Sequence, residues 1–341
     1  MKEPAKVFLS RDINKIVQKI DAQRLGENVG IKVHFGEKGC VTFVNPEIVK
    51  TIYKKIISFG KKSSLIETNV LYRGERTKKD THIKLAKAHG FNFAPIDILD
   101  GIQGEAFVEI PIEKGLISSA KLGKGILKYD SLVVISHFKG HHLAGYGGAF
   151  KNLGMGFASR AGKFQMHALT KPKIDTEKCV GCGLCVKSCN FKAITINKKT
   201  GKAEINPEKC AGCTMCIAVC PKEAVEIPWE ETSENLQKKI VDYASGVLKI
   251  IPKEKIQYVN VLEKITEKCD CMEEPQKPVI EDIGILYSTD PVAIDKASLD
   301  LAISSSDGKF EKINSVDKYV QVEYAFRKGL GKKDYKLFNL D

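Results

Sequence analysis

The chain has 341 residues, a net charge of +12 and eleven cysteines, so it is long enough for two or three domains with a sizeable core. No apolar run has the length of a membrane helix or a signal peptide, and the lysines are scattered rather than gathered into a basic stripe. These patterns argue against a membrane span and against nucleic-acid binding. Unpaired thiols in such number are typical of a reducing compartment, so we expect a cytoplasmic protein.

The first part of the chain alternates between strand-like and helix-like patterns. Short apolar and β-branched runs predict strands at residues 28–34, 63–67, 94–99 and 131–136. Apolar residues at helical spacing predict helices at residues 46–57 and 81–88. Strands that alternate with helices are typical of parallel βαβ units, so this part predicts an α/β domain.

A stretch rich in glycine and histidine follows the last of these strands. Residues 136–156 contain three histidines and six glycines, among them Gly145, Gly147 and Gly148. Glycines let backbone N–H groups approach a ligand, while His141 adds a titratable group and Lys151 a fixed cation. Because parallel sheets bind ligands at the carboxyl ends of their strands, we expect a small-molecule site here. The alternative is a tight structural turn with solvent-facing histidines.

Eight of the eleven cysteines form two runs with the spacing C-x2-C-x2-C-x3-C, and the two runs are 31 residues apart. Residues 174–228 therefore resemble the two-cluster bacterial ferredoxins, in which the fourth cysteine of each run ligates the other cluster. The resemblance implies two [4Fe–4S] clusters. Two zinc knuckles are the alternative, but these would show paired CxxC units farther apart. The predicted ligand sets are Cys179, Cys182, Cys185 with Cys220, and Cys210, Cys213, Cys216 with Cys189.

The α/β pattern resumes after the cysteine runs. It predicts a helix at residues 233–249, strands at 256–262 and 283–287, and a helix that begins with Asp290 at the N-cap and Pro291 at the first turn. We therefore expect an α/β domain with a parallel or mixed sheet and an inserted ferredoxin-like α+β unit with two clusters. The expected boundaries are residues 1–170 and 231–341 for the two parts of the α/β domain and 171–230 for the insert.

Three cysteines lie outside the two runs. Cys269 and Cys271 are two residues apart, so they could ligate a further metal together with Asp270 or a distant histidine such as His167, or serve redox chemistry. A disulfide between them is expected to be strained and disfavoured in a reducing compartment. A pair of partly buried thiols without a function is the alternative. Cys40 is expected to be structural.

Two further resemblances cover the α/β part. The segments H-F-G-E at 34–37, G-G-A-F-K-N-L-G-M-G at 147–156 and D-P-V-A-I-D at 290–295 are similar to an uncharacterised family with a domain of unknown function, which often carries a two-cluster ferredoxin unit. The motif H-x-x-A-G-Y that begins at His141, with Lys151 downstream, is similar to one in nickel-pincer lactate racemases. The two differ just before the lysine, where the racemases have Ser-Gly-Gly-Arg and this chain has G-G-A-F at residues 147–150.

The racemase similarity implies a role for four residues. Lys151 would tether a nickel cofactor, His141 would be a catalytic base, His167 would ligate nickel and His82 would be a second base. Glycines 145, 147 and 148 would then lie against the cofactor.

Three functional hypotheses follow from these patterns. The first is an iron–sulfur oxidoreductase that relays electrons between a redox partner, such as an acidic ferredoxin, and a small molecule at the Gly/His stretch. The second is a non-catalytic electron carrier or docking module. The third is a racemase- or isomerase-like enzyme with a lysine-tethered nickel cofactor.

Overall fold

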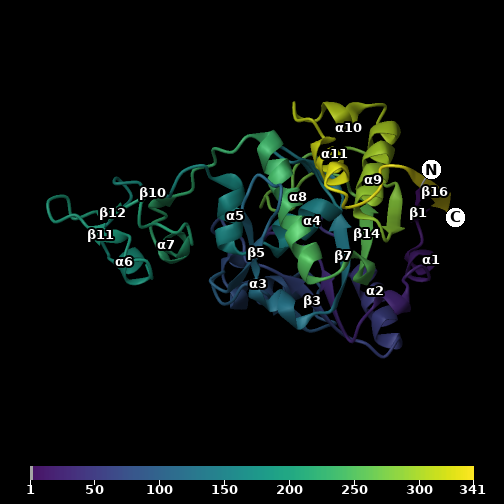
Figure 1. Ribbon diagram of the computed structural model, residues 1–341, viewed down its shortest axis with the longest axis horizontal. Coiled ribbons are helices and arrows are strands. Elements are labelled where there is room, and N and C mark those ends of the chain that lie inside the picture. The colour runs from purple at the N-terminus through teal and green to yellow at the C-terminus, as the bar shows by residue number, and fades with distance from the viewer. Residues whose placement is uncertain (1–2) are drawn as a thin grey trace.

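One eight-stranded sheet forms the centre of the computed structural model, which describes residues 3–341 (Figure 1). Seven of its strands run parallel to one another, and the third in spatial order runs antiparallel to both of its neighbours. The fold is therefore α/β with a mixed sheet, as predicted. In spatial order the strands are β16 (Tyr335–Asn339), β1 (Ala5–Ser10), β15 (Gly284–Ser288), β14 (Ile256–Leu262), β7 (Ser131–His137), β2 (Asn28–Lys32), β3 (Lys62–Glu67) and β4 (Ile96–Ile98).

The two central strands, β7 and β14, are buried along their whole length. Successive side chains of a strand point to opposite faces, so Leu132 and Val134 of β7 join one hydrophobic core while Val133 and Ile135 join the other. This is why β7 reads as a continuous apolar run rather than an alternating one.

Helices cover both faces of the sheet. Each predicted helix forms close to its expected bounds, and α2 begins as its sequence indicates, with the Asn45 side chain accepting a hydrogen bond from the Glu47 N–H at 3.0 Å. The first core is covered by α4 (Ala149–Phe157), α8 (Ser233–Ile250), α9 (Pro291–Ser305), α10 (Lys309–Lys312) and α11 (Val320–Arg327). The second core is covered by α1 (Ile13–Val17), α2 (Pro46–Ser58) and α3 (Lys79–Ala88).

The Gly/His stretch is not a single loop. It forms a short hairpin of β8 (Lys139–His141) and β9 (Gly145–Gly147) and then enters α4. Glycine is needed inside this helix because α4 packs on α8 at very close range. A Cβ on Gly154 would lie 2.1 Å from the carbonyl oxygen of Ile240. A second hairpin, β5 (Phe107–Pro111) with β6 (Ser119–Gly123), was not predicted.

Among the described residues, those between α5 (Arg160–His167) and α8 add no strand to the large sheet, and they lie to one side of it (Figure 1). This segment, here called the insert, contains two small helices and two two-stranded sheets. Each sheet pairs a strand of one cysteine repeat with a strand of the other, so the two repeats interlock. The elements are β10 (Lys173–Ile174) with β13 (Val225–Glu226), β11 (Ile194–Ile196) with β12 (Ala203–Ile205), α6 (Leu184–Lys187) and α7 (Met215–Val219).

Candidate functional site

A cavity of about 700 Å³ lies beyond the carboxyl ends of β2, β3 and β7. Its volume is in the range usual for small-molecule sites, and its place in the sheet is the one predicted for a ligand. Five of the seven histidines of the chain line it. These are His34, His137, His141, His142 and His167.

A buried carboxylate, Asp270, holds one wall of the cavity in place. Its oxygens lie 2.9 Å from His137 Nδ1 and 2.8 Å from Lys139 Nζ, and Thr42 Oγ1 donates to it at 3.4 Å. Burial opposes the ionisation of Asp270, but His137 and Lys139 outweigh that effect and hold its pKa well below the usual range. The segment that carries Asp270 is therefore fixed to both β7 and the β8 hairpin.

Two thiols flank this carboxylate, and both line the cavity. The neighbouring Cys271 thiol lowers the pKa of Cys269, and Lys151 and His141 add to this lowering against the effect of burial. Lys151 Nζ lies 3.7 Å from Cys269 Sγ. Cys269, together with burial, raises the pKa of Cys271 in turn. These opposite shifts favour a thiolate on Cys269 and a protonated thiol on Cys271.

The tautomer of His141 follows from its backbone contacts. Its Nδ1 accepts hydrogen bonds from the N–H groups of Leu143 at 3.2 Å and Ala144 at 3.0 Å. A neutral ring then carries its proton on Nε2, the nitrogen that can donate to Cys269. Burial, assisted by the charge of Lys151, lowers the pKa of His141 to about 4. At neutral pH this ring presents a hydrogen-bond donor to the thiolate.

The other predicted site residues separate into two groups. His167, the last residue of α5, lines the cavity, and burial lowers its pKa to about 3. Gly147 and Gly148 also line the cavity, and Gly145 has a φ of +72° in the hairpin turn. His82 does not join them. It lies on α3, fully buried, with its ring 5.7 Å from that of Phe35.

A second set of charged groups was not foreseen as part of the site. Arg76 is buried and bonds Glu37 through Nε at 3.0 Å and His34 through Nη1 at 2.9 Å, with Tyr72 as a third partner. The sequence feature that pointed to this set was the H-F-G-E segment at residues 34–37, because His34 and Glu37 both contact Arg76. Lys139, which contacts Asp270, carried no sequence signal at all.

The motif D-P-V-A-I-D at residues 290–295 begins α9 and contacts the first turn of α4, in the Gly/His stretch. Asp290 caps α9, accepting from the N–H groups of Val292 and Ala293 at 3.0 Å. Asp295 accepts from the N–H groups of Ala149 and Phe150 at 2.7 and 3.0 Å, at the first turn of α4. Burial raises the pKa of Asp295 to about 6. This carboxylate fixes the start of the helix that carries Lys151.

In the insert, the eight cysteines of the two runs gather into two groups. Cys179, Cys182, Cys185 and Cys220 line one small cavity, and Cys189, Cys210, Cys213 and Cys216 line another. Each group has the membership predicted from the spacing. Backbone N–H groups donate to three of these sulfurs, from Ala203 to Cys179 at 3.4 Å, from Ala193 to Cys189 at 3.3 Å and from Ala224 to Cys220 at 3.3 Å.

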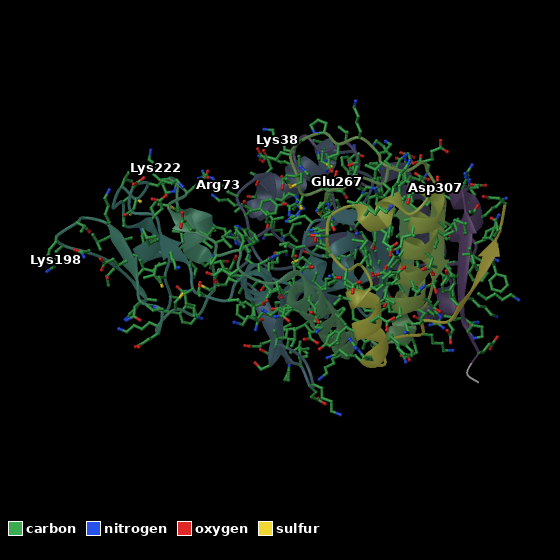
Figure 2. All side chains as sticks on the ribbon, turned by 90° about the horizontal axis from the view of Figure 1, so that it is seen from above. Lys38, Arg73, Lys198, Lys222, Glu267 and Asp307 are labelled. Carbon is green, nitrogen blue, oxygen red and sulfur yellow. The ribbon has the colours of Figure 1, made fainter. Side chains whose placement is uncertain are left out.

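The insert contacts the α/β body near the central cavity. Arg73 Nη1 donates to the carbonyl oxygens of Cys220 and Pro221 at 3.2 and 3.3 Å, and Figure 2 shows Arg73 beside the insert. A Cβ on Gly212 would lie 3.4 Å from the ring of Phe164 on α5. Arg160, the first residue of α5, is close enough to Cys216 for the two to affect each other electrostatically. The insert therefore packs on the helix that ends at the cavity.

The described residues contain no group of three or more His, Cys, Asp or Glu side chains arranged to hold a single metal ion. Within residues 3–341, no helix is long and apolar enough to cross a membrane.

A family model identified as "Domain of unknown function (DUF362)" matches residues 29–300. The chain belongs to this family. No curated protein matches the chain. The family carries no assigned activity in its description, so the chemistry of this DUF362 protein has to be argued from its own residues.

Two solved structures are similar to this DUF362 chain at low identity. One is the lactate racemase apoprotein from Thermoanaerobacterium thermosaccharolyticum, with 14% identity, a TM-score of 0.37 and coverage of 75% of this chain and 50% of that one. The other is a protein from Thermotoga maritima, with 10% identity, a TM-score of 0.42 and coverage of 86% and 57%. The chain thus spans about half the length of these proteins.

Proposed function

We propose that this protein binds two [4Fe–4S] clusters in the insert and that it is an oxidoreductase, relaying electrons between an external carrier and a small molecule in the central cavity. The observation that carries the proposal is the grouping of the eight cysteines into two sets of four around two separate cavities. A bound cluster of this type supplies one-electron transfer.

The residues around each set suit a cluster. The loops that carry the first three thiols contain Gly181 and Gly212 with φ of +66° and +68°, a conformation that lets backbone pass close to inorganic sulfide. The N–H groups that donate to Cys179, Cys189 and Cys220 would stabilise negative charge on the sulfurs. A cubane spaces its four thiolates more widely than a single ion does, so the lack of a single-ion arrangement among the described residues is compatible with this assignment.

The contact between the insert and α5 supports a relay toward the cavity. Arg160 faces the set that contains Cys216, and His167 at the other end of α5 lines the cavity. Eight helical residues span about 12 Å at 1.5 Å per residue. Trp229, near the end of the insert, also lines the cavity and packs edge-on against His167 with ring centroids 4.8 Å apart. His167 and Trp229 thus place two aromatic rings where the insert meets the cavity.

The cavity itself favours a reactive site over a docking surface alone. It holds the Cys269 thiolate beside Lys151, enclosed by buried ionisable groups. Such groups in a cleft are typical of functional sites. The net charge of +12 supports an acidic protein, such as a ferredoxin, as the external carrier.

The ligand sets can be tested with single substitutions in protein purified without oxygen. Cys182→Ser and Cys213→Ser lie in different sets, so each should remove one cluster and leave the other. Cys40→Ser is the matched control, because Cys40 is a buried cysteine outside both sets and should keep both clusters. The measurement is the electron paramagnetic resonance spectrum of the dithionite-reduced protein together with its iron content. Full iron content in both set variants would refute the assignment.

A further inference from the structure

We propose that Cys269 and Cys271 form a redox-active dithiol that reduces a small-molecule disulfide in the central cavity, becoming a Cys269–Cys271 disulfide in the process. This inference goes beyond electron relay by the insert, because the dithiol itself reacts with the ligand. Only the final step, the return of the pair to its reduced state, rests on the proposed function.

The backbone brings the two thiols within reach of each other. The N–H of Met272 donates to the carbonyl oxygen of Cys269 at 3.1 Å, which closes a turn with Cys269 at its first position and Cys271 at its third. The first and third Cα atoms of such a turn are within about 6 Å of each other, inside the range that a disulfide spans. The two thiols are close enough for each to shift the pKa of the other. Oxidation therefore needs no large backbone movement.

The turn is held rigidly with both thiols toward the cavity. Asp270, between them, points the other way to His137 and Lys139. Two glycines allow neighbouring loops to press against the same segment. A Cβ on Gly39, whose φ is +88°, would lie 2.3 Å from the Glu273 carbonyl oxygen, and one on Gly140 would lie 2.3 Å from that of Glu267. A fixed pair of thiols is suited to repeated oxidation and reduction.

The surroundings of the pair make Cys269 the attacking group. Lys151 at 3.7 Å and the donor nitrogen of His141 stabilise a thiolate on Cys269, while Cys271 keeps its proton. The thiolate is the nucleophile in thiol–disulfide exchange. Cys271 is less buried than Cys269, and the turn places it where it can attack the mixed disulfide that Cys269 forms with the ligand.

The cavity selects the size of the substrate. At about 700 Å³, with Leu143, Met155 and Met272 in its walls, it can enclose a small disulfide with an apolar body. Cys269 is only 2% exposed, so a folded protein cannot reach it.

The reaction balances in two exchanges. The Cys269 thiolate attacks one sulfur of the ligand disulfide, which forms a mixed disulfide and releases one ligand thiolate. That thiolate takes the proton of Cys271, and the new Cys271 thiolate attacks Cys269 sulfur, which releases the second ligand thiolate. The ligand gains two electrons and the protein pair loses two. Return of the pair to a Cys269 thiolate and a Cys271 thiol takes two electrons and one proton. Two one-electron iron–sulfur carriers would supply that number of electrons.

The test uses the full chain, purified without oxygen, with bis(2-hydroxyethyl) disulfide as the probe. After reaction, acid stops further thiol exchange, and the free thiols of the denatured protein are then blocked with a maleimide near neutral pH before digestion with trypsin. Cleavage after Lys268 and after Lys296 gives the peptide 269–296, because trypsin does not cut between Lys277 and Pro278, and this peptide contains no other cysteine. Its mass reports the state of the pair directly, and iron content is measured on the same sample.

In the wild-type chain we expect the peptide to lose two hydrogens in mass, the signature of the internal disulfide. Cys271→Ser should instead accumulate a mixed disulfide on Cys269, and Cys269→Ser should lose both products. A wild-type peptide that stays a dithiol, or a Cys271→Ser chain without adduct, would overturn the inference. Because the peptide mass and the iron content are independent readouts, a lack of iron would refute the clusters while leaving the dithiol result readable. Dithionite reduction of the oxidised, iron-loaded chain, compared with an iron-free preparation, then tests the final step. Equal rates of disulfide loss in the two preparations would refute it.

Discussion

Substitution of His141 by asparagine should change how the stability of the protein depends on pH. In the folded protein His141 has a pKa of about 4, against about 6.5 for an exposed histidine. Its pKa is lowered on folding, so its contribution to stability is fully present above about pH 6.5 and is lost as pH falls toward 4. Between pH 7.5 and 5.5 the unfolded chain gains most of one proton that the folded chain does not bind. The expected loss in the free energy of unfolding is about 1.4 kcal/mol.

His141→Asn is chosen because it keeps the local backbone contacts. An asparagine oxygen can accept the N–H groups of Leu143 and Ala144 as Nδ1 does, but it does not titrate. Urea unfolding followed by circular dichroism at both pH values gives the assay. The wild type should lose about 1.4 kcal/mol more than the variant on going from pH 7.5 to 5.5. An equal pH dependence in the two proteins would show that His141 is not held neutral in the way argued.

Three further predictions concern single residues. Asp295→Asn should lower the free energy of unfolding by about 1–3 kcal/mol, because a neutral amide replaces the carboxylate that accepts two N–H groups at the start of α4. Urea unfolding at pH 7.5 measures this loss, and an unchanged unfolding midpoint would contradict the prediction. Arg160→Met removes a buried positive charge near Cys216, so it should lower the midpoint potential of the cluster held by that set by roughly tens of millivolts and leave the other potential unchanged. A potentiometric titration measures both potentials, and a shift in both or in neither would count against this prediction. Lys151→Met should raise the pH midpoint of Cys269 alkylation, because it removes the positive charge beside the thiolate. The control Lys61→Met, whose lysine pairs with Glu27, should leave that midpoint unchanged. Identical alkylation profiles for Lys151→Met and the wild type would show that Lys151 does not stabilise the thiolate.

The sequence predicts most of the large sheet because its strands and helices have strong local signals. A continuous apolar run marks β7, β-branched and aromatic residues mark β14, and Asp290 with Pro291 marks the start of α9. The hairpins and β16 have weaker patterns, since they are short, partly exposed or rich in glycine, and they were missed. The helical nature of residues 149–157 was also hidden, because glycines placed there for close packing on α8 are typical of loops.

The candidate site was predictable only in part. Spacing along the chain predicts three cysteines of each set, because they lie in one local loop, and the resemblance to two-cluster ferredoxins supplies the fourth from the other repeat. The meeting of Lys151 with Cys269, 118 residues later, depends on the crossover from β7 to β14 and has no local signal. The same holds for Asp270 with Lys139 and for Arg76 with Glu37, which are long-range partners fixed by the fold. His82 shows the opposite case, where a residue of suitable chemistry is buried away from the cavity.

The central claim is that the two groups of four cysteines hold two [4Fe–4S] clusters. The most direct test is quantification of iron, acid-labile sulfide and other metals in protein purified without oxygen. We predict about eight irons and about eight sulfides per chain. Zinc in place of iron, or no bound metal after cluster reconstitution, would contradict the account.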